Sequence, residues 1–132
     1  MSAARKISEA EEILIKIQNT PSNFKLELEN FVRTINDVFL RLLDEYNVKF
    51  GLGIKRIGFE KFKSIAKKAG KIDAINFLIW YEKEYKKLRD DPEFGKFLEK
   101  EFTIQEDHDI IRSCSALLDR VKNMTYYAYE NF

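Results

Sequence analysis

The sequence predicts a single all-α domain, an up-down antiparallel helical bundle with a four-helix-type core and short extra helices. Apolar residues recur at three- and four-residue steps over long stretches, which is the period of an amphipathic helix. Only five Gly and two Pro interrupt the 132 residues, so the chain has few of the turn residues that an all-β fold needs. This length suits one domain with one core, and we assign residues 1–132 to it.

The first two helices are predicted from a cap and a stripe. The first is expected to begin at Ser8, because Ser8 and Glu11 form an S-x-x-E capping box, and to end before Pro21. The second is expected from about Asn23 to Tyr46, a length of ~35 Å, enough for one full side of a bundle. Its apolar stripe consists of Phe24, Leu28, Phe31, Val32, Ile35, Val38, Phe39, Leu42, Leu43 and Tyr46.

A glycine-rich stretch separates the second helix from a short third one. Three glycines fall within residues 50–58, and such a cluster predicts a loop. The next residues, Phe59 to Ala69, have the spacing of a short amphipathic helix, and Gly70 is expected to end it.

The fourth helix, from about Ile72 to Arg89, carries more apolar residues than one core face requires. Phe77, Ile79 and Trp80 make its middle apolar nearly all the way round. Two explanations are open: either this helix lies centrally in the bundle, or a second face of it meets a partner chain.

The last part of the chain predicts a short helix and a long one. Pro92 suits the first position of a short helix that extends through Phe102, and Thr103 with Glu106 forms a second capping box. The final helix carries the stripe Ile110, Ile111, Cys114, Leu117, Leu118, Val121, Met124 and Ala128. It continues into an aromatic end with Tyr126, Tyr127, Tyr129 and Phe132.

Composition excludes several classes of protein. A net charge of +1 indicates no global preference for nucleic acid or for an anionic membrane. The single cysteine excludes an internal disulfide and fits a reducing compartment. No run approaches the ~18 apolar residues of a membrane span, and the first residues turn acidic where a signal peptide turns apolar. We therefore expect a cytoplasmic protein with no membrane partner.

No motif for a metal, a cofactor or a nucleophile stands out. One His and one Cys cannot form a Cys/His zinc site. The acidic run around His108, residues 106–109, is interpreted as the first turn of the last helix, where carboxylates complement the helix dipole. Cys114 lies on the apolar stripe and is interpreted as a small buried residue. We expect no metal and no cofactor, and no small-molecule substrate can be identified.

Basic residues are concentrated between Lys49 and Lys71. The segment holds eight basic residues against one acidic residue, Glu60, a net charge of +7. The basic residues are Lys49, Lys55, Arg56, Lys61, Lys63, Lys67, Lys68 and Lys71. Two explanations are open: contact with the phosphates of a nucleic acid, or a solvated face balanced by acids elsewhere in a nearly neutral chain.

Three segments carry a resemblance to a known family. They are residues 31–38 (FVRTINDV), Glu45–Ile54 (EYNVKFGLGI), and residues 77–85 (FLIWYEKEY) followed by LRDDPEFGKFL. Together they resemble an uncharacterised prokaryotic, largely archaeal, group with HEPN-like helical bundles, over roughly Asn23 to Phe102. The resemblance implies a four-helix bundle that commonly dimerises, and its active members are metal-independent ribonucleases.

The catalytic motif of that family is degenerate in this chain. The family pattern is an Arg, often followed by Asn, with a His four to six residues later. Here only His108 matches, and the Arg-Asn positions hold Glu101 and Phe102. A carboxylate repels the phosphate that a guanidinium would hold. If the chain were a nuclease, its groups would be His108 with Lys100 or Arg112.

We therefore expect a HEPN-like bundle without ribonuclease activity that acts as a protein-interaction and dimerisation module, as a homodimer. The predicted interface residues are the aromatic ones of the fourth and last helices: Phe77, Trp80, Tyr81, Tyr126 and Tyr127. The alternatives are a HEPN-type metal-independent ribonuclease or toxin–antitoxin component, and an RNA- or DNA-binding module. That module would use the basic patch at Lys55, Arg56, Lys61, Lys63, Lys67, Lys68 and Lys71.

Overall fold

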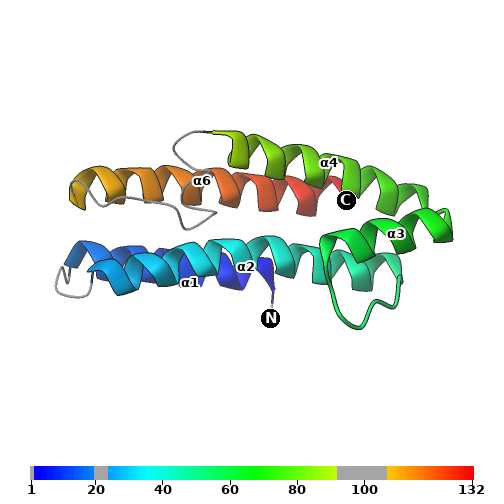
Figure 1. Cartoon of the computed structure of the whole chain (residues 1–132), viewed down its shortest axis with the longest axis horizontal. Helices are drawn as coiled ribbons and strands as arrows, with labels where there is room; N and C mark the ends of the chain where they lie inside the picture. Colours follow the sequence, from blue (N-terminus) through cyan, green and yellow to red (C-terminus); the bar gives the residue numbers. More distant parts are fainter. Residues whose placement is uncertain (1, 20–23, 92–106) are drawn as a thin grey trace.

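The computed structural model describes residues 2–19, 24–91 and 107–132, and these ranges contain five α-helices and no strand. The helices are α1 (Ala3–Asn19), α2 (Phe24–Phe50), α3 (Phe59–Ala69), α4 (Ile72–Asp90) and α6 (Asp107–Asn131). The four long helices run up and down the molecule in two layers, α1 with α2 and α4 with α6, while α3 lies at one end (Figure 1). The predicted all-α bundle is confirmed.

The predicted start of the first helix is wrong, because α1 begins at Ala3 and Ser8 lies inside it. The cap is Ser2, whose Oγ accepts a hydrogen bond from the main-chain N–H of Arg5 at 3.1 Å. A second free N–H of the first turn, that of Ala3, donates to Glu45 Oε1 of α2 at 2.7 Å. The carboxylate that completes this cap therefore comes from another helix, and no local pattern could reveal it.

The second helix extends four residues beyond the predicted end at Tyr46, to Phe50. Gly51 then takes a left-handed conformation with φ of 64°, which a glycine adopts without strain. The side chain of Asn47, in the last turn of α2, forms two hydrogen bonds with the main chain of Ile54 in the loop that follows. Its Nδ2 donates to the carbonyl oxygen at 2.8 Å, and its Oδ1 accepts from the N–H at 3.0 Å.

The short helix α3 has the predicted bounds, Phe59–Ala69. Gly70 ends it in a left-handed conformation with φ of 63°, and its N–H donates to the carbonyl oxygen of Lys67. The next helix, α4, begins two residues later, so α3 turns the chain from one layer of the bundle to the other.

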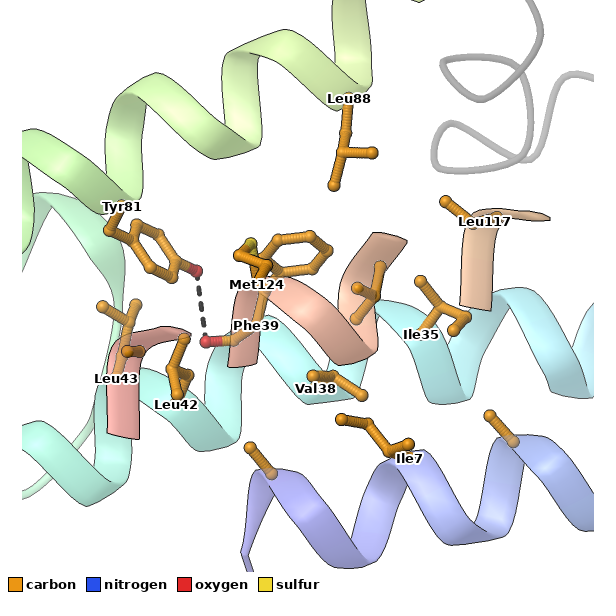
Figure 2. Close-up of a cluster of buried hydrophobic side chains, with 14 of the residues drawn as sticks. Ile7, Ile35, Val38, Phe39, Leu42, Leu43, Tyr81, Leu88, Leu117 and Met124 are labelled. Atoms are coloured by element: carbon orange, nitrogen blue, oxygen red, sulfur yellow. Dashed lines mark hydrogen bonds between the residues drawn. The ribbon is translucent and has the colours of Figure 1, made fainter. Parts of the chain in front are cut away.

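A single apolar core joins both layers. Every member of the predicted α2 stripe whose side chain is described is buried, as are all but Ile111 of the predicted α6 stripe. Figure 2 shows Ile7 of α1 facing Val38 of α2, with Leu117 and Met124 of α6 above them. The same core includes Ala74, Phe77, Leu78, Tyr81 and Leu88 of α4.

Some predictions concern residues outside the described ranges. These are the short helix from Pro92 to Phe102 and the second capping box, of Thr103 and Glu106; the structure describes α6 from Asp107 onward. Within the parts of the chain that are described, no helix has the length and apolar character needed to span a membrane.

Candidate functional site

The inner face of α4 is attached to the bundle through Phe77, which is fully buried. Its ring stacks on Tyr46 of α2 with a centroid distance of 4.2 Å. It also lies 5.8 Å from the ring of Phe62 in α3 and 5.7 Å from that of Phe132. One side chain thus contacts α2, α3 and the residue that follows α6.

A second apolar side of α4 is covered by α6 of the same chain. The Trp80 indole stacks on Tyr127 with a centroid distance of 5.3 Å and an interplanar angle of 21°, and it lies 5.5 Å from the Phe132 ring. Trp80 remains half-buried, whereas Tyr127 is exposed. Much of the unusual apolar circumference of α4 is therefore explained by contacts within one chain.

The five predicted interface residues divide into two groups. Phe77 and Tyr81 are buried inside the chain, so their side chains are not available to a second copy. Trp80 is half-buried, and Tyr126 and Tyr127 are exposed at the end of α6. Of the five predicted residues, therefore, Trp80, Tyr126 and Tyr127 present side-chain surface that a partner can cover.

An apolar stripe that the prediction of interface residues did not include lies on the opposite side of α4 from Phe77. Ile72 is 71% exposed and Ile79 is 61% exposed. They are seven residues apart, about two helical turns, so they lie on the same side. Ile75 lies between them and is half-buried. We call Ile72, Ile75 and Ile79 the outer stripe of α4.

Three of the predicted basic residues have partners inside the chain. Lys71 donates to the carbonyl oxygen of Phe50, and Lys49 donates to a main-chain oxygen of Phe132. Lys63 forms a long ion pair with Glu82, with 4.0 Å between the charged atoms. These three cations therefore have a structural explanation.

The other five basic residues are exposed and form no ion pair with any residue that the structure describes. They are Lys55, Arg56, Lys61, Lys67 and Lys68. Along α3, Lys61 and Lys68 are seven residues apart and share one flank, whereas Lys63 and Lys67 are four apart and share the other. The buried face of α3 separates the two flanks, so the cations surround the helix rather than form one flat surface.

Of the residues proposed for a nuclease, only Arg112 has a side chain in the described part of the chain. Lys100 and the side chain of His108 lie outside the described residues; Arg112 is exposed on α6. The described ranges contain no group of three or more His, Cys, Asp or Glu side chains that could hold a metal ion.

The Cys114 thiol is buried in the core, as predicted. Burial raises its pKa to about 12, because a thiolate would lose its hydration there. The reactive form of cysteine is the thiolate. Cys114 therefore packs as an apolar residue and is not an activated nucleophile.

Two tyrosines that appeared in the sequence only as part of apolar or aromatic segments form hydrogen bonds between helices. The Tyr46 hydroxyl donates to the carbonyl oxygen of Ala128 at 2.6 Å, and burial raises its pKa to about 12. The Tyr129 hydroxyl donates to Glu45 Oε1 at 3.1 Å; burial and this bond raise the pKa of Tyr129. Both groups stay protonated and tie α6 to α2.

Together these features define an all-α bundle whose exposed chemistry is an apolar stripe on α4, an aromatic end on α6 and free cations around α3. Comparison of the chain with family models, with curated proteins and with solved structures gives no match in any of the three. The role of the chain is therefore inferred from its own residues and geometry.

Proposed function

We propose that the chain is a HEPN-like helical bundle that lacks ribonuclease activity and acts through protein contacts, as a homodimer. The observation that carries this proposal is the outer stripe of α4. The inner residues of α4 have their partners in α2, α3 and α6, yet Ile72 and Ile79 remain more than half exposed. Exposed apolar side chains that line up on one helix face mark an interaction surface.

The spacing of the outer stripe suits packing against a second copy of the same helix. Ile72, Ile75 and Ile79 are separated by three and four residues, which is the spacing of a helix–helix seam. A two-fold axis beside residues 75 and 76 would bring Ile72 of one copy against Ile79 of the partner subunit. Trp80 and Tyr127 present further aromatic surface on α4 and α6.

The absence of ribonuclease activity is proposed from the sequence. A carboxylate, Glu101, occupies the position where the family motif has its phosphate-binding arginine. An acidic group there disfavours an RNA phosphate instead of binding it. This part of the proposal is independent of the dimer, because it concerns a different segment of the chain.

We expect the protein to sediment as a dimer at micromolar concentration and Ile79→Glu to sediment as a monomer. The dimer would bury one new carboxylate from each copy, so its dissociation constant should rise at least ~100-fold. Analytical ultracentrifugation over a concentration series measures this change. Ile15→Glu is the matched control, because Ile15 is 55% exposed but lies on α1.

Two results would contradict the dimer. One is a wild-type protein that stays monomeric at micromolar concentration. The other is equal disruption by Ile15→Glu and Ile79→Glu, which would indicate general loss of apolar surface and not a specific seam. Circular dichroism of each variant establishes that its helices are intact.

A second function, nucleic-acid binding, is favoured by one observation. Five exposed cations at the α3 end have no ion-pair partner among the described residues. Lys61, Lys67 and Lys68 lie on the two flanks of α3, and Lys55 and Arg56 lie in the loop before it. This arrangement suits non-specific contact with phosphates, and the exposed residues of α3 include no aromatic side chain for base stacking.

For this second function we expect affinity for single-stranded RNA that falls steeply with salt. Each phosphate contact adds about 0.7 to the slope of log affinity against log salt. Replacing Lys67 and Lys68 together by glutamine should reduce affinity by about 3- to 10-fold, whereas the same change at Lys83 and Lys86 of α4 should not. Absent or salt-insensitive binding would exclude nucleic-acid binding by these cations.

The ribonuclease alternative has its own test. Cleavage of the RNA in EDTA, abolished by His108→Ala, would support it.

A further inference from the structure

A groove with a volume of about 830 Å³ runs between α2 and the second half of α4, and α3 closes one end. Its floor consists of Phe39, Leu43 and Tyr81, which are buried. Figure 2 shows these three side chains between the two helices. Leu40, at the edge of the groove, is 42% exposed. The volume falls within the range of sites that hold small organic molecules.

Four aromatic rings meet in this groove. The ring of Phe39 lies 4.8 Å from Tyr85 and 6.1 Å from Tyr81, both edge to face. Tyr81 lies nearly parallel to Phe59 of α3 at 6.0 Å and to Tyr85 at 6.4 Å. Aromatic faces carry partial negative charge. The groove is therefore apolar and, at the same time, favourable for a positive charge.

The Tyr81 hydroxyl does not provide acid–base chemistry in this groove. It donates a hydrogen bond to the carbonyl oxygen of Phe39 at 3.1 Å, the bond drawn in Figure 2. Burial raises the pKa of Tyr81 far above that of a free tyrosine, so the hydroxyl stays protonated. Tyr81 thus contributes its ring, and the site is suited to binding and not to proton transfer.

One cation of the chain already lies on this aromatic cluster. The Arg89 guanidinium lies over the ring of Tyr85, 5.8 Å from its centroid, a distance at which cation and ring attract each other. This contact is at the end of the groove away from α3. The two residues are four apart on α4, so this contact is local to one helix.

The side chains that line the groove carry a small excess of negative charge. Three carboxylates, of Glu60, Glu82 and Asp90, line it against two cations, of Lys86 and Arg89. Glu60 and Asp90 form no ion pair with a described residue, and the pair of Glu82 with Lys63 is long. Glu60 and Glu82 adjoin Phe59 and Tyr81 in sequence, so carboxylates and aromatic rings occur together at the α3 end.

We propose that this groove binds an organic cation, an amine or quaternary ammonium group carried on an apolar body. The cation lies at the α3 end, near Phe59 and the carboxylates of Glu60 and Glu82. The apolar body extends along Leu40 and Tyr85. The groove occupies the second half of α4, whereas the outer stripe occupies the first, so this site does not depend on the dimer.

The test uses three probes with the same phenyl body and different head groups: phenethylammonium, 2-phenylethanol and 3-phenylpropionate. NMR titration of the full chain should give a dissociation constant for phenethylammonium of about 1 mM or tighter, with the alcohol about fivefold weaker and the carboxylate weaker still. Equal affinity for the alcohol, tighter binding of the carboxylate, or no saturation by phenethylammonium would each overturn the proposal.

Two variants separate the cation site from a general apolar groove. Phe59→Leu keeps an apolar side chain but removes the ring at the α3 end, so it should weaken phenethylammonium about fivefold and the alcohol less than twofold. Glu82→Gln leaves the rings intact and should weaken only the cation, by about two- to threefold. Tyr126→Leu, at the end of α6, is the control and should change neither. Equal weakening of cation and alcohol by Phe59→Leu would contradict a role for the ring face.

Failure of this proposal is distinguishable from failure of the dimer. Ile79→Glu, which should be monomeric, is expected to bind phenethylammonium with the wild-type dissociation constant. A change of more than about threefold in that variant would place the ligand at the interface between copies and overturn the assignment to the groove.

Discussion

Replacing Phe77 by alanine is expected to lower the free energy of unfolding by about 3–5 kcal/mol, the cost of a large cavity in an aromatic core. Phe77 is fully buried and contacts the rings of Tyr46, Phe62 and Phe132. α4 meets its neighbours mainly through such rings, so its attachment should suffer more than the α1–α2 pair. Urea unfolding followed by far-ultraviolet circular dichroism measures the total loss.

Native-state hydrogen exchange tests where the loss falls. In Phe77→Ala, amides of α3 and α4 should exchange faster through local opening, while amides of α1 and α2 should change only as much as global stability does. Lys87→Ala is the control on the same helix; as Lys87 is exposed, we expect a change within about 0.5 kcal/mol. A loss below about 1.5 kcal/mol for Phe77→Ala would contradict its role as the anchor of α4.

The long helices could be predicted because each has enough periodic residues to average over local exceptions. The α2 stripe is buried wherever its side chains are described, and α3 has the predicted ends, since Gly70 is the residue type that a left-handed cap favours. The start of α1 could not be predicted. The S-x-x-E pattern favours Ser8 over Ser2, which has Arg5 at the matching position. The contribution of Glu45 to the cap depends on how α1 and α2 pack.

The surfaces were harder to predict than the helices, for a physical reason. The composition of α4 indicated more apolar area than one face needs, but it cannot say which neighbour covers which side. Phe77 and Tyr81 face the core, and Trp80 faces Tyr127 and Phe132 of the same chain. The groove between α2 and α4 could not be found at all, because it depends on the separation of two helices that are far apart in sequence.

The second large effect concerns the loop after α2. Replacing Asn47 by leucine should lower the free energy of unfolding by about 2–4 kcal/mol, because two buried main-chain groups of Ile54 lose their partner. The Asn47 side chain donates to the Ile54 carbonyl at 2.8 Å and accepts from its N–H at 3.0 Å. Ile54 is itself part of the core. Urea unfolding measures the loss, and Gln18→Leu, at an exposed position of α1, is the control.

Asn47→Asp tests whether both hydrogen bonds matter, through its dependence on pH. A protonated carboxyl can donate to one group of Ile54 and accept from the other, as the amide does, whereas a carboxylate repels the carbonyl. The folded state should therefore raise the pKa of this carboxyl above its unfolded value of about 3.9. Relative to wild type, the variant should be most stable below the unfolded-state pKa. Its stability should fall as the pH rises from the unfolded-state pKa to the higher folded-state pKa, and stay constant above that. A difference from wild type that is the same at pH 3 and pH 7 would show that the donor half of this contact contributes nothing.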